Sequence, residues 1–148
     1  MGSGVLRPGE VLVTPRRTVG ECDINLFAGL VSDFTPIHVD EVFAQDTPYG
    51  GRIAHGTLTM STAIGLLTQS GRLGENVIGL LNLNWDFSGP VRIGDTISAR
   101  VTIAERRATR KPGRVVVVFA FEVLNQHQDV VQTGRMTVLM RDEGEASA

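Results

Sequence analysis

The stretch between positions 31 and 61 of the chain contains the residue types of an acid/base active site. Asp33 and His38 stand close together, and His55 is followed directly by Gly56. Aspartate and histidine side chains commonly transfer protons in enzymes. A helix that begins near Gly56 would add a positive dipole and unpaired N–H groups, which stabilise negative charge on a substrate. This stretch therefore predicts a small active site with an anion-stabilising backbone amide.

A first predicted helix brings the chain to the acid/base pair. Thr18 and Glu21 have the spacing of a capping box, and apolar residues recur at helical spacing until about Ser32. Pro36 disfavours helical geometry at the residue before it, so segment 33–38 must bend away from this helix. Functional side chains often occupy such loops and helix ends.

A second, longer helix is predicted over residues 53–69. The segment is apolar, with Ser, Thr and Gly between the apolar residues and no charge beyond His55, which predicts a helix buried nearly all round. Residues 40–44 predict a short helix before it. The intervening loop, residues 47–51, contains Pro and two Gly and is interpreted as a lid or the edge of a channel.

The second half of the chain has the composition of a sheet. Four runs rich in Val, Ile, Thr and Phe are separated by turn residues, at Val77–Phe87, Thr96–Arg107, Arg114–Asn125 and Val130–Arg141. A short strand is predicted at Val11–Val13. Helices followed by an antiparallel meander predict an α+β fold in which the apolar helix packs on one face of the sheet. Residues 1–148 are expected to form a single domain, with 1–8 and 142–148 flexible.

Composition argues against several classes of function. A net charge of −2 and 5% aromatic residues give little basis for binding nucleic acid. No apolar run approaches the roughly 20 residues of a membrane span. Cys22 is the single cysteine, which excludes an internal disulfide, and it is interpreted as a small apolar filler on the first helix. A cytoplasmic protein is expected.

Two sequence motifs together resemble a known family. The segment Asp33-Phe34-Thr35-Pro36-Ile37-His38, followed by His55-Gly56, is similar to the MaoC-like dehydratases, the hotdog-fold (R)-specific enoyl-thioester hydratases. The resemblance covers most of the chain and implies a hotdog fold, an antiparallel sheet wrapped around a central helix. The family pattern is usually Gly-Asp-x-Asn-Pro, whereas this chain has Ser32 and Thr35 at the corresponding positions.

The resemblance also implies roles for individual residues. Asp33 and His38 would be the catalytic pair, and the backbone N–H of Gly56 would stabilise the oxyanion. The remaining residues predicted to bind the substrate or support the site are Ser61, His55 and Thr35. Alternatives stay open, because Asp33 can serve as a turn residue, His38 as a hydrogen-bonded loop histidine and Ser61 as a side chain bonded to its own helix.

The implied activity is hydration of enoyl thioesters, or dehydration of (R)-3-hydroxyacyl thioesters, by a lyase of fatty acid metabolism. No metal or redox cofactor is expected, since coenzyme A or phosphopantetheine is part of the substrate. A site formed by His38, Asp40 and His55 has no spacing typical of metal ligands. The substrate would be an acyl-CoA or an acyl-carrier-protein thioester, and a homodimer is implied. The alternatives are a hotdog thioesterase and a non-catalytic partner subunit of a heteromeric dehydratase.

A basic cluster has two interpretations. It consists of Arg106, Arg107, Arg110, Lys111 and Arg114, around one predicted hairpin. It is either a solvated turn that protects a sheet edge or a landing site for phosphates of coenzyme A or an acidic carrier protein.

Overall fold

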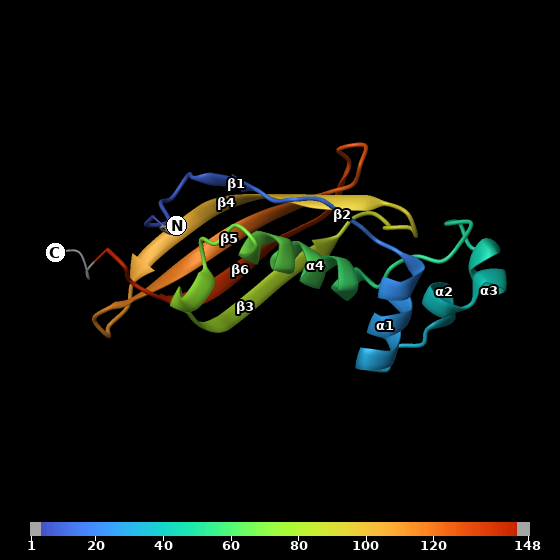
Figure 1. The fold of residues 1–148 in the computed structure, drawn as a ribbon, viewed down its shortest axis with the longest axis horizontal. Helices are drawn as coiled ribbons and strands as arrows, with labels where there is room; N and C mark the ends of the chain where they lie inside the picture. Colours follow the sequence, from blue (N-terminus) through green and yellow to red (C-terminus); the bar gives the residue numbers. More distant parts are fainter. Residues whose placement is uncertain (1–3, 145–148) are drawn as a thin grey trace.

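The computed structural model describes residues 4–144 and consists mainly of one antiparallel sheet with a helix, α4, along one face (Figure 1). The strands are hydrogen-bonded in the order β1-β4-β5-β6-β3, and β2 pairs with β4 off this path. Their bounds are β1 Val11–Val13, β2 Arg17–Thr18, β3 Val77–Phe87, β4 Thr96–Ala108, β5 Arg114–Leu124 and β6 Val130–Arg141. The helices are α1 Glu21–Val31, α2 Pro36–Val39, α3 Glu41–Gln45 and α4 Gly56–Thr68, and a 3-10 turn spans Gly74–Asn76. The predicted α+β class is confirmed.

The core lies between α4 and the inner face of the sheet. Every second residue of the first half of β4 is at most 1% exposed, as expected for a strand with one buried face, namely Ile97, Ala99, Val101 and Ile103. Ala63 and Leu67 of α4 pack against them and are fully buried. The prediction that this helix is buried nearly all round is wrong, because the sheet covers only one side of it. Gly56, Thr57, Ser61 and Thr68 are exposed.

The outermost strand, β3, departs from strict alternation. In the sequence, Leu81, Leu83 and Trp85 alternate with Asn residues, which predicts one apolar face toward the helix. Leu83 and Trp85 pack against the core as this pattern predicts. Leu81 is instead 54% exposed, and its neighbour Leu80 is 56% exposed. The pairing of β3 with β6 shifts register twice in the first half of the strand, which breaks the strict alternation of the two faces. The β3 edge therefore carries exposed apolar side chains.

Helix α1 begins later than the predicted capping box requires. Thr18 lies in β2, opposite Thr96, and the two hydroxyl groups are 2.7 Å apart. The capping residue is instead Gly20, whose backbone N–H donates to the carboxylate of Asp23 at 2.8 Å. The predicted box is wrong because strand pairing holds Thr18 in an extended conformation.

Cys22 lies on the outer side of α1. The helix buries Ile24 and Ala28 against the core, four positions apart, and this phase turns Cys22 toward solvent, where it is exposed. The interpretation of Cys22 as an apolar filler is therefore wrong.

The described parts of both terminal segments pack against the sheet. Leu6 is 6% exposed and belongs to the core. Asp142 forms an ion pair of 2.5 Å with Arg106, and its backbone N–H donates to Gly113 at 2.9 Å. Residues 1–3 and 145–148, also expected to be flexible, lie outside the described residues. Among residues 4–144, no helix combines the length and the apolar character needed to cross a membrane.

Candidate active site

Asp33 emerges where the chain leaves α1. The preceding residue, Ser32, caps the helix with a φ of +63°, a left-handed conformation that ends the helix. Thr35 then donates twice to Oδ1 of Asp33, from its hydroxyl at 2.5 Å and from its backbone N–H at 3.1 Å. These bonds hold the pKa of Asp33 below its usual value, and His55 and His38 act in the same direction, against the effect of partial burial. Asp33 is therefore ionised at neutral pH.

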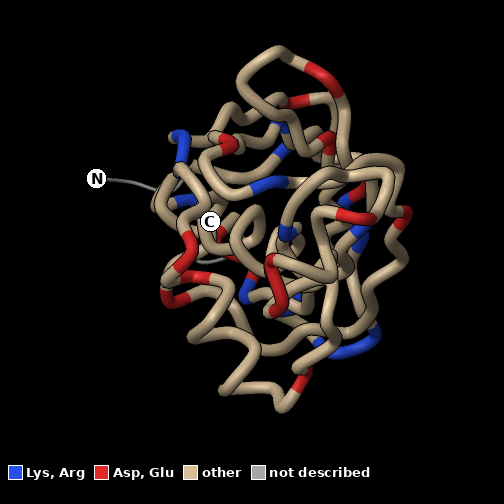
Figure 2. The backbone as a smooth tube through the Cα atoms, turned by 90° about the vertical axis from the view of Figure 1, so that its right-hand side faces the viewer, with Lys and Arg blue, Asp and Glu red and all other residues tan. Residues whose placement is uncertain are grey.

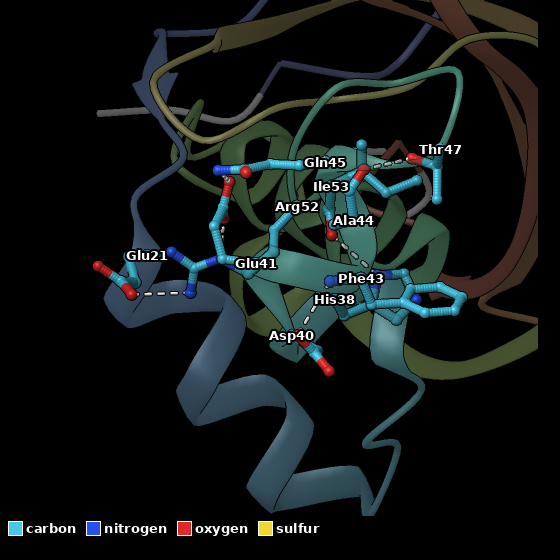
Figure 3. Close-up of polar contacts among 10 residues, drawn as sticks. All are labelled: Glu21, His38, Asp40, Glu41, Phe43, Ala44, Gln45, Thr47, Arg52 and Ile53. Atoms are coloured by element: carbon cyan, nitrogen blue, oxygen red, sulfur yellow. Dashed lines mark hydrogen bonds and ion pairs between the residues drawn. The ribbon is translucent and has the colours of Figure 1, made fainter.

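His38 is oriented by one backbone carbonyl. It lies in α2, a single helical turn that starts at Pro36, rather than in an irregular loop. Its Nδ1 is 2.8 Å from the carbonyl oxygen of Ile53 (Figure 3). Because a carbonyl oxygen can only accept, Nδ1 carries the proton, and Nε2 is left as an acceptor in the neutral ring.

An arginine joins the short helices beside His38. Arg52 donates from Nε to Glu41 of α3 at 2.5 Å and from Nη1 to Glu21 of α1 at 2.7 Å (Figure 3). The guanidinium lowers the pKa of Glu41, and the two carboxylates raise the pKa of Arg52. This ion-pair cluster connects α1 and α3 immediately before Ile53, the residue that orients His38.

His55 is buried behind the acid/base pair. It is 2% exposed, and its Nε2 lies 3.0 Å from the backbone carbonyl of Asp33, so Nε2 is the donor. Its ring stacks on His38 at a centroid distance of 3.9 Å and an interplanar angle of 24°. Phe27 of α1 meets it edge-on at 5.0 Å. His55 thus contacts both the Asp33 backbone and the His38 ring.

Gly56 is the first residue of α4, directly after His55. The N–H groups of Leu58 and Thr59 bond to the carbonyl of His55, whereas those of Gly56 and Thr57, at the first two helical positions, have no carbonyl within the helix to bond. A side chain at position 56 would collide with Phe87, because a Cβ there would lie 2.8 Å from the ring. Glycine lets this end of the helix approach β3 closely.

One cavity of about 640 Å³ unites these residues. Asp33, His38, His55 and Gly56 all line it, together with Tyr49 from the loop that was interpreted as a channel edge. The other lining residues are Ile53, Ala54, Thr57, Thr59, Phe87, Ser88, Gly89, Pro90, Val91 and Gln132. Thr35 is not among them and acts on the cavity through Asp33.

Two buried polar residues of the cavity were not predicted. Gln132 of β6 is 2% exposed, and Thr59 of α4 is 1% exposed. Gln132 has a recognisable signal in the sequence, because it shares the alternating phase of the buried residues Met136, Val138 and Met140 and is the polar exception among them. Thr59 has no such signal in a helix that is already rich in Ser and Thr.

Two other predicted sites lie away from the cavity. Ser61 is exposed and does not line it, so a role for Ser61 in substrate binding stays a prediction.

The basic cluster surrounds the β4–β5 turn, at the opposite end of the molecule from α2 (Figure 1). Two of its members are paired, Arg106 with Asp142 and Arg107 with Glu105. In a single chain, its position does not support a phosphate site for this cavity. Figure 2, which faces the α1–α3 end, shows acidic and basic positions interspersed.

The histidines and the carboxylate also form a set of possible metal ligands. Asp33, His38 and His55 each offer one ligand atom within 4.8 Å of the others, and imidazole with carboxylate suits zinc and similar ions. However, Nδ1 of His38 and Nε2 of His55 already donate to backbone carbonyls, and Nδ1 of His55 is buried. Asp40, considered as a ligand from sequence, instead caps α3 by accepting from Phe43 at 3.0 Å.

The fold defines the class of protein. A helix lying on a long antiparallel sheet is the hotdog architecture, and the chain superposes on a Mycobacterium tuberculosis protein described as having a double hotdog fold, with a TM-score of 0.80 at 20% identity over 93% of this chain and 43% of that one. A crystal structure of the MaoC-like dehydratase from Rhodospirillum rubrum gives a TM-score of 0.83 at 29% identity, over 93% of this chain and 94% of that one.

The chain belongs to the MaoC-like domain family, whose model matches residues 5–123. It is 44% identical over 91 residues to the (R)-specific enoyl-CoA hydratase of Rhodospirillum rubrum, and these residues cover 59% of each chain. Across three curated relatives, the aligned region covers between 29% and 62% of their length. Two of these three relatives are named as an (R)-specific enoyl-CoA hydratase and a 3-hydroxybutyryl-CoA dehydratase. The resemblance found in the sequence motifs is confirmed at the level of the family.

Proposed function

We propose that the protein adds water to 2-enoyl thioesters and, in reverse, dehydrates (R)-3-hydroxyacyl thioesters. The observation that carries this proposal is the closeness of an ionised carboxylate and an imidazole that both line the cavity. Asp33 and His38 have ligand atoms within 4.8 Å of each other. Because hydrogen bonds to water are about 2.8 Å long, one water molecule can bridge both groups.

In this proposal Asp33 and His38 have different roles in the reaction. Asp33 has one oxygen occupied by Thr35, and Oδ2 accepts no hydrogen bond from residues 4–144, so it is available to take the proton from water. His38 orients the same water through Nε2. The hydroxide forms a bond to the β carbon, the double-bond electrons move toward the carbonyl, and the proton held by Asp33 is delivered to the α carbon. Dehydration uses the same groups in the opposite order.

The start of α4 stabilises the charge that develops on the thioester oxygen. The N–H of Gly56 and the helix dipole present positive charge at the cavity wall. Such a donor typically contributes roughly 3–4 kcal/mol to transition-state stabilisation.

The substrate would be the thioester of coenzyme A or of a carrier protein. In this proposal the acyl group enters the cavity beside Tyr49. The cavity volume of about 640 Å³ leaves room for more than the reacting atoms. No metal or redox cofactor takes part in the proposed steps.

We also propose a homodimer that pairs through β3. This strand is at the edge of the sheet, and an unpaired edge with apolar side chains is a surface for another chain. Five apolar side chains of β3 are between 39% and 56% exposed, namely Val77, Ile78, Leu80, Leu81 and Phe87. Leu80→Lys should shift the protein toward the monomer in sedimentation, and an unchanged dimer would argue against this edge.

The test of function is incubation with crotonyl-CoA, following the conjugated thioester by absorbance and the product by chiral chromatography. We expect formation of (R)-3-hydroxybutyryl-CoA. Release of free thiol without hydration would instead identify a thioesterase. Binding without either reaction, across several acyl lengths, would favour the non-catalytic partner subunit.

A further inference from the structure

A buried glutamine connects the sheet to the first residue of α4. Gln132 of β6 is 2% exposed. Its Nε2 donates to the backbone carbonyl of Gly56 at 3.0 Å, and its Oε1 accepts from the indole N–H of Trp85 at 2.9 Å. A buried amide that loses a partner carries a substantial desolvation cost, so both bonds restrict where this side chain can lie.

The sheet is shaped to hold this glutamine in one orientation. Trp85 pairs directly with Gly134 across the β3–β6 ladder, and a Cβ at position 134 would lie 2.0 Å from the indole ring. The missing side chain lets the indole lie flat across β6, where it also packs on Phe121 at a centroid distance of 5.1 Å. Trp85 and Gln132 are diagonal neighbours on the same face of the ladder, within reach of a long side chain. The indole N–H therefore selects the amide orientation that points Nε2 at Gly56.

Phe87 makes a second contact with Gly56, the first residue of α4. Phe87 is the ladder partner of Gln132, and its ring lies against the position where Gly56 would carry a Cβ. The backbone N–H groups of Ser88 and Gly89, which follow, both donate to Val131 at 3.0 Å. The start of α4 is thus seated between a hydrogen bond from β6 and an aromatic ring from β3. We call Trp85, Phe87 and Gln132 the helix seat.

We infer that Gln132 is a positioning residue that fixes the first turn of α4, so that the Gly56 amide meets the thioester oxygen in the transition state. Gln132 does not touch the reacting atoms. It acts through the backbone carbonyl of Gly56, the same residue whose backbone N–H is the proposed oxyanion donor. This inference rests on the proposed function and assigns a cause to the placement of that donor.

The test compares Gln132→Met with Gln69→Met. Gln132→Met keeps the length of the side chain and removes both hydrogen bonds, whereas Gln69 is an exposed residue at the other end of α4. We expect kcat for crotonyl-CoA to fall about tenfold in Gln132→Met with KM within about twofold, because a small displacement of a donor is costly in the transition state. Gln69→Met should match the parent. Trp85→Phe, which removes the N–H that orients the amide together with part of the ring, should lower kcat by about threefold.

A conservative variant separates positioning from packing. In Gln132→Glu, a protonated carboxyl can still donate to the Gly56 carbonyl, and an ionised carboxylate repels it. The ratio of its kcat to that of the parent should therefore be highest at acid pH and fall as pH rises. An unchanged kcat in Gln132→Met, a change in KM alone, or a pH-independent ratio in Gln132→Glu would overturn the inference and leave Gln132 a packing residue.

Failure of the proposed function can be distinguished from failure of this inference. If the parent protein hydrates no enoyl thioester, the proposed function is wrong, whatever Gln132 does. The seat is then tested by the backbone amide chemical shifts of Gly56 and Thr57 in the folded protein. Shifts displaced in Gln132→Met and unchanged in Gln69→Met support positioning by Gln132, and unchanged shifts in both overturn it.

Discussion

The two halves of the candidate site are held in place by different kinds of contact. Asp33 and His38 are partly buried and are oriented by contacts within 22 positions of the chain, namely the bonds from Thr35 to Asp33 and the contacts with Ile53 and His55. Gly56 is placed by the helix seat, whose hydrogen bond from Gln132 joins residues 76 positions apart in the chain. The acid/base half can therefore be tuned by single local substitutions, whereas the oxyanion half depends on the packed sheet.

The largest expected effect falls on the acid/base half. Asp33→Asn should lower kcat by about a thousandfold, because an amide cannot accept the proton from water. Thermal stability should change little, since Asp33 is only partly buried. Steady-state kinetics with crotonyl-CoA beside a thermal melt measure both. Asp46→Asn, an exposed carboxylate of the same region, is the control, and equal activity of the two variants would remove Asp33 from the mechanism.

A methyl group at the start of α4 should disturb the other half almost as strongly. Gly56→Ala places a Cβ 2.8 Å from the Phe87 ring and must displace either the ring or the helix end. We expect kcat to fall by about a hundredfold. Gly65→Ala, on the same helix with no atom within 4 Å of the added Cβ, should keep full activity. Full activity in both variants would show that close seating of Gly56 is not required.

The third change acts on the electrostatics of the acid/base half. Thr35→Val removes the hydroxyl that donates to Asp33, so the pKa of Asp33 should rise toward its usual value. Because the ionised form is the base, the acid limb of the pH–rate profile should move to higher pH. At pH 7.5 the loss in kcat should stay below about tenfold, the effect of one hydrogen bond. Thr35→Ser keeps the hydroxyl and should retain the parent profile, and identical profiles in all three proteins would contradict this account of Asp33.

The smallest effect concerns the frame around the acid/base half. Arg52→Met breaks both ion pairs of the α1–α3 cluster and should lower the melting temperature by about 2–4 °C near neutral pH, with kcat within about twofold of the parent. The pKa of Glu41 is lowered in the folded protein, so this stabilisation is present above its unfolded value and is lost as pH falls through the folded one. The melting difference should therefore shrink in acid. Arg17→Met, which removes a more exposed arginine that forms one ion pair, with Asp23, is the matched control. Equal melting changes would argue against a special role for Arg52.

The same contrast explains what could be predicted from the sequence. Residues 33–38 and the pair His55-Gly56 are contiguous motifs, and the four long strands have a clear β composition, so the hotdog fold and the candidate residues were within reach. The structure brings Asp33, His38, His55 and Gly56 to one cavity.

The rest depended on contacts that no local pattern contains. Burial of α4 on one face only follows from the single sheet layer, and the extended conformation of Thr18 follows from its pairing with a strand 78 residues later. The double hydrogen bond from Thr35 depends on loop geometry set by the left-handed cap at Ser32. Gln132 is polar where the other buried residues of its phase on β6 are apolar, but this difference does not predict that its side chain bonds to the carbonyl of Gly56.

The most direct test of the two-part site is a crystal structure of Asp33→Asn with crotonyl-CoA bound. The account predicts the thioester oxygen about 3 Å from the backbone nitrogen of Gly56, the β carbon facing His38 and the substituted side chain at position 33, and a water molecule between those two side chains. A thioester bound with its oxygen away from Gly56, or an acyl group outside the cavity, would contradict it.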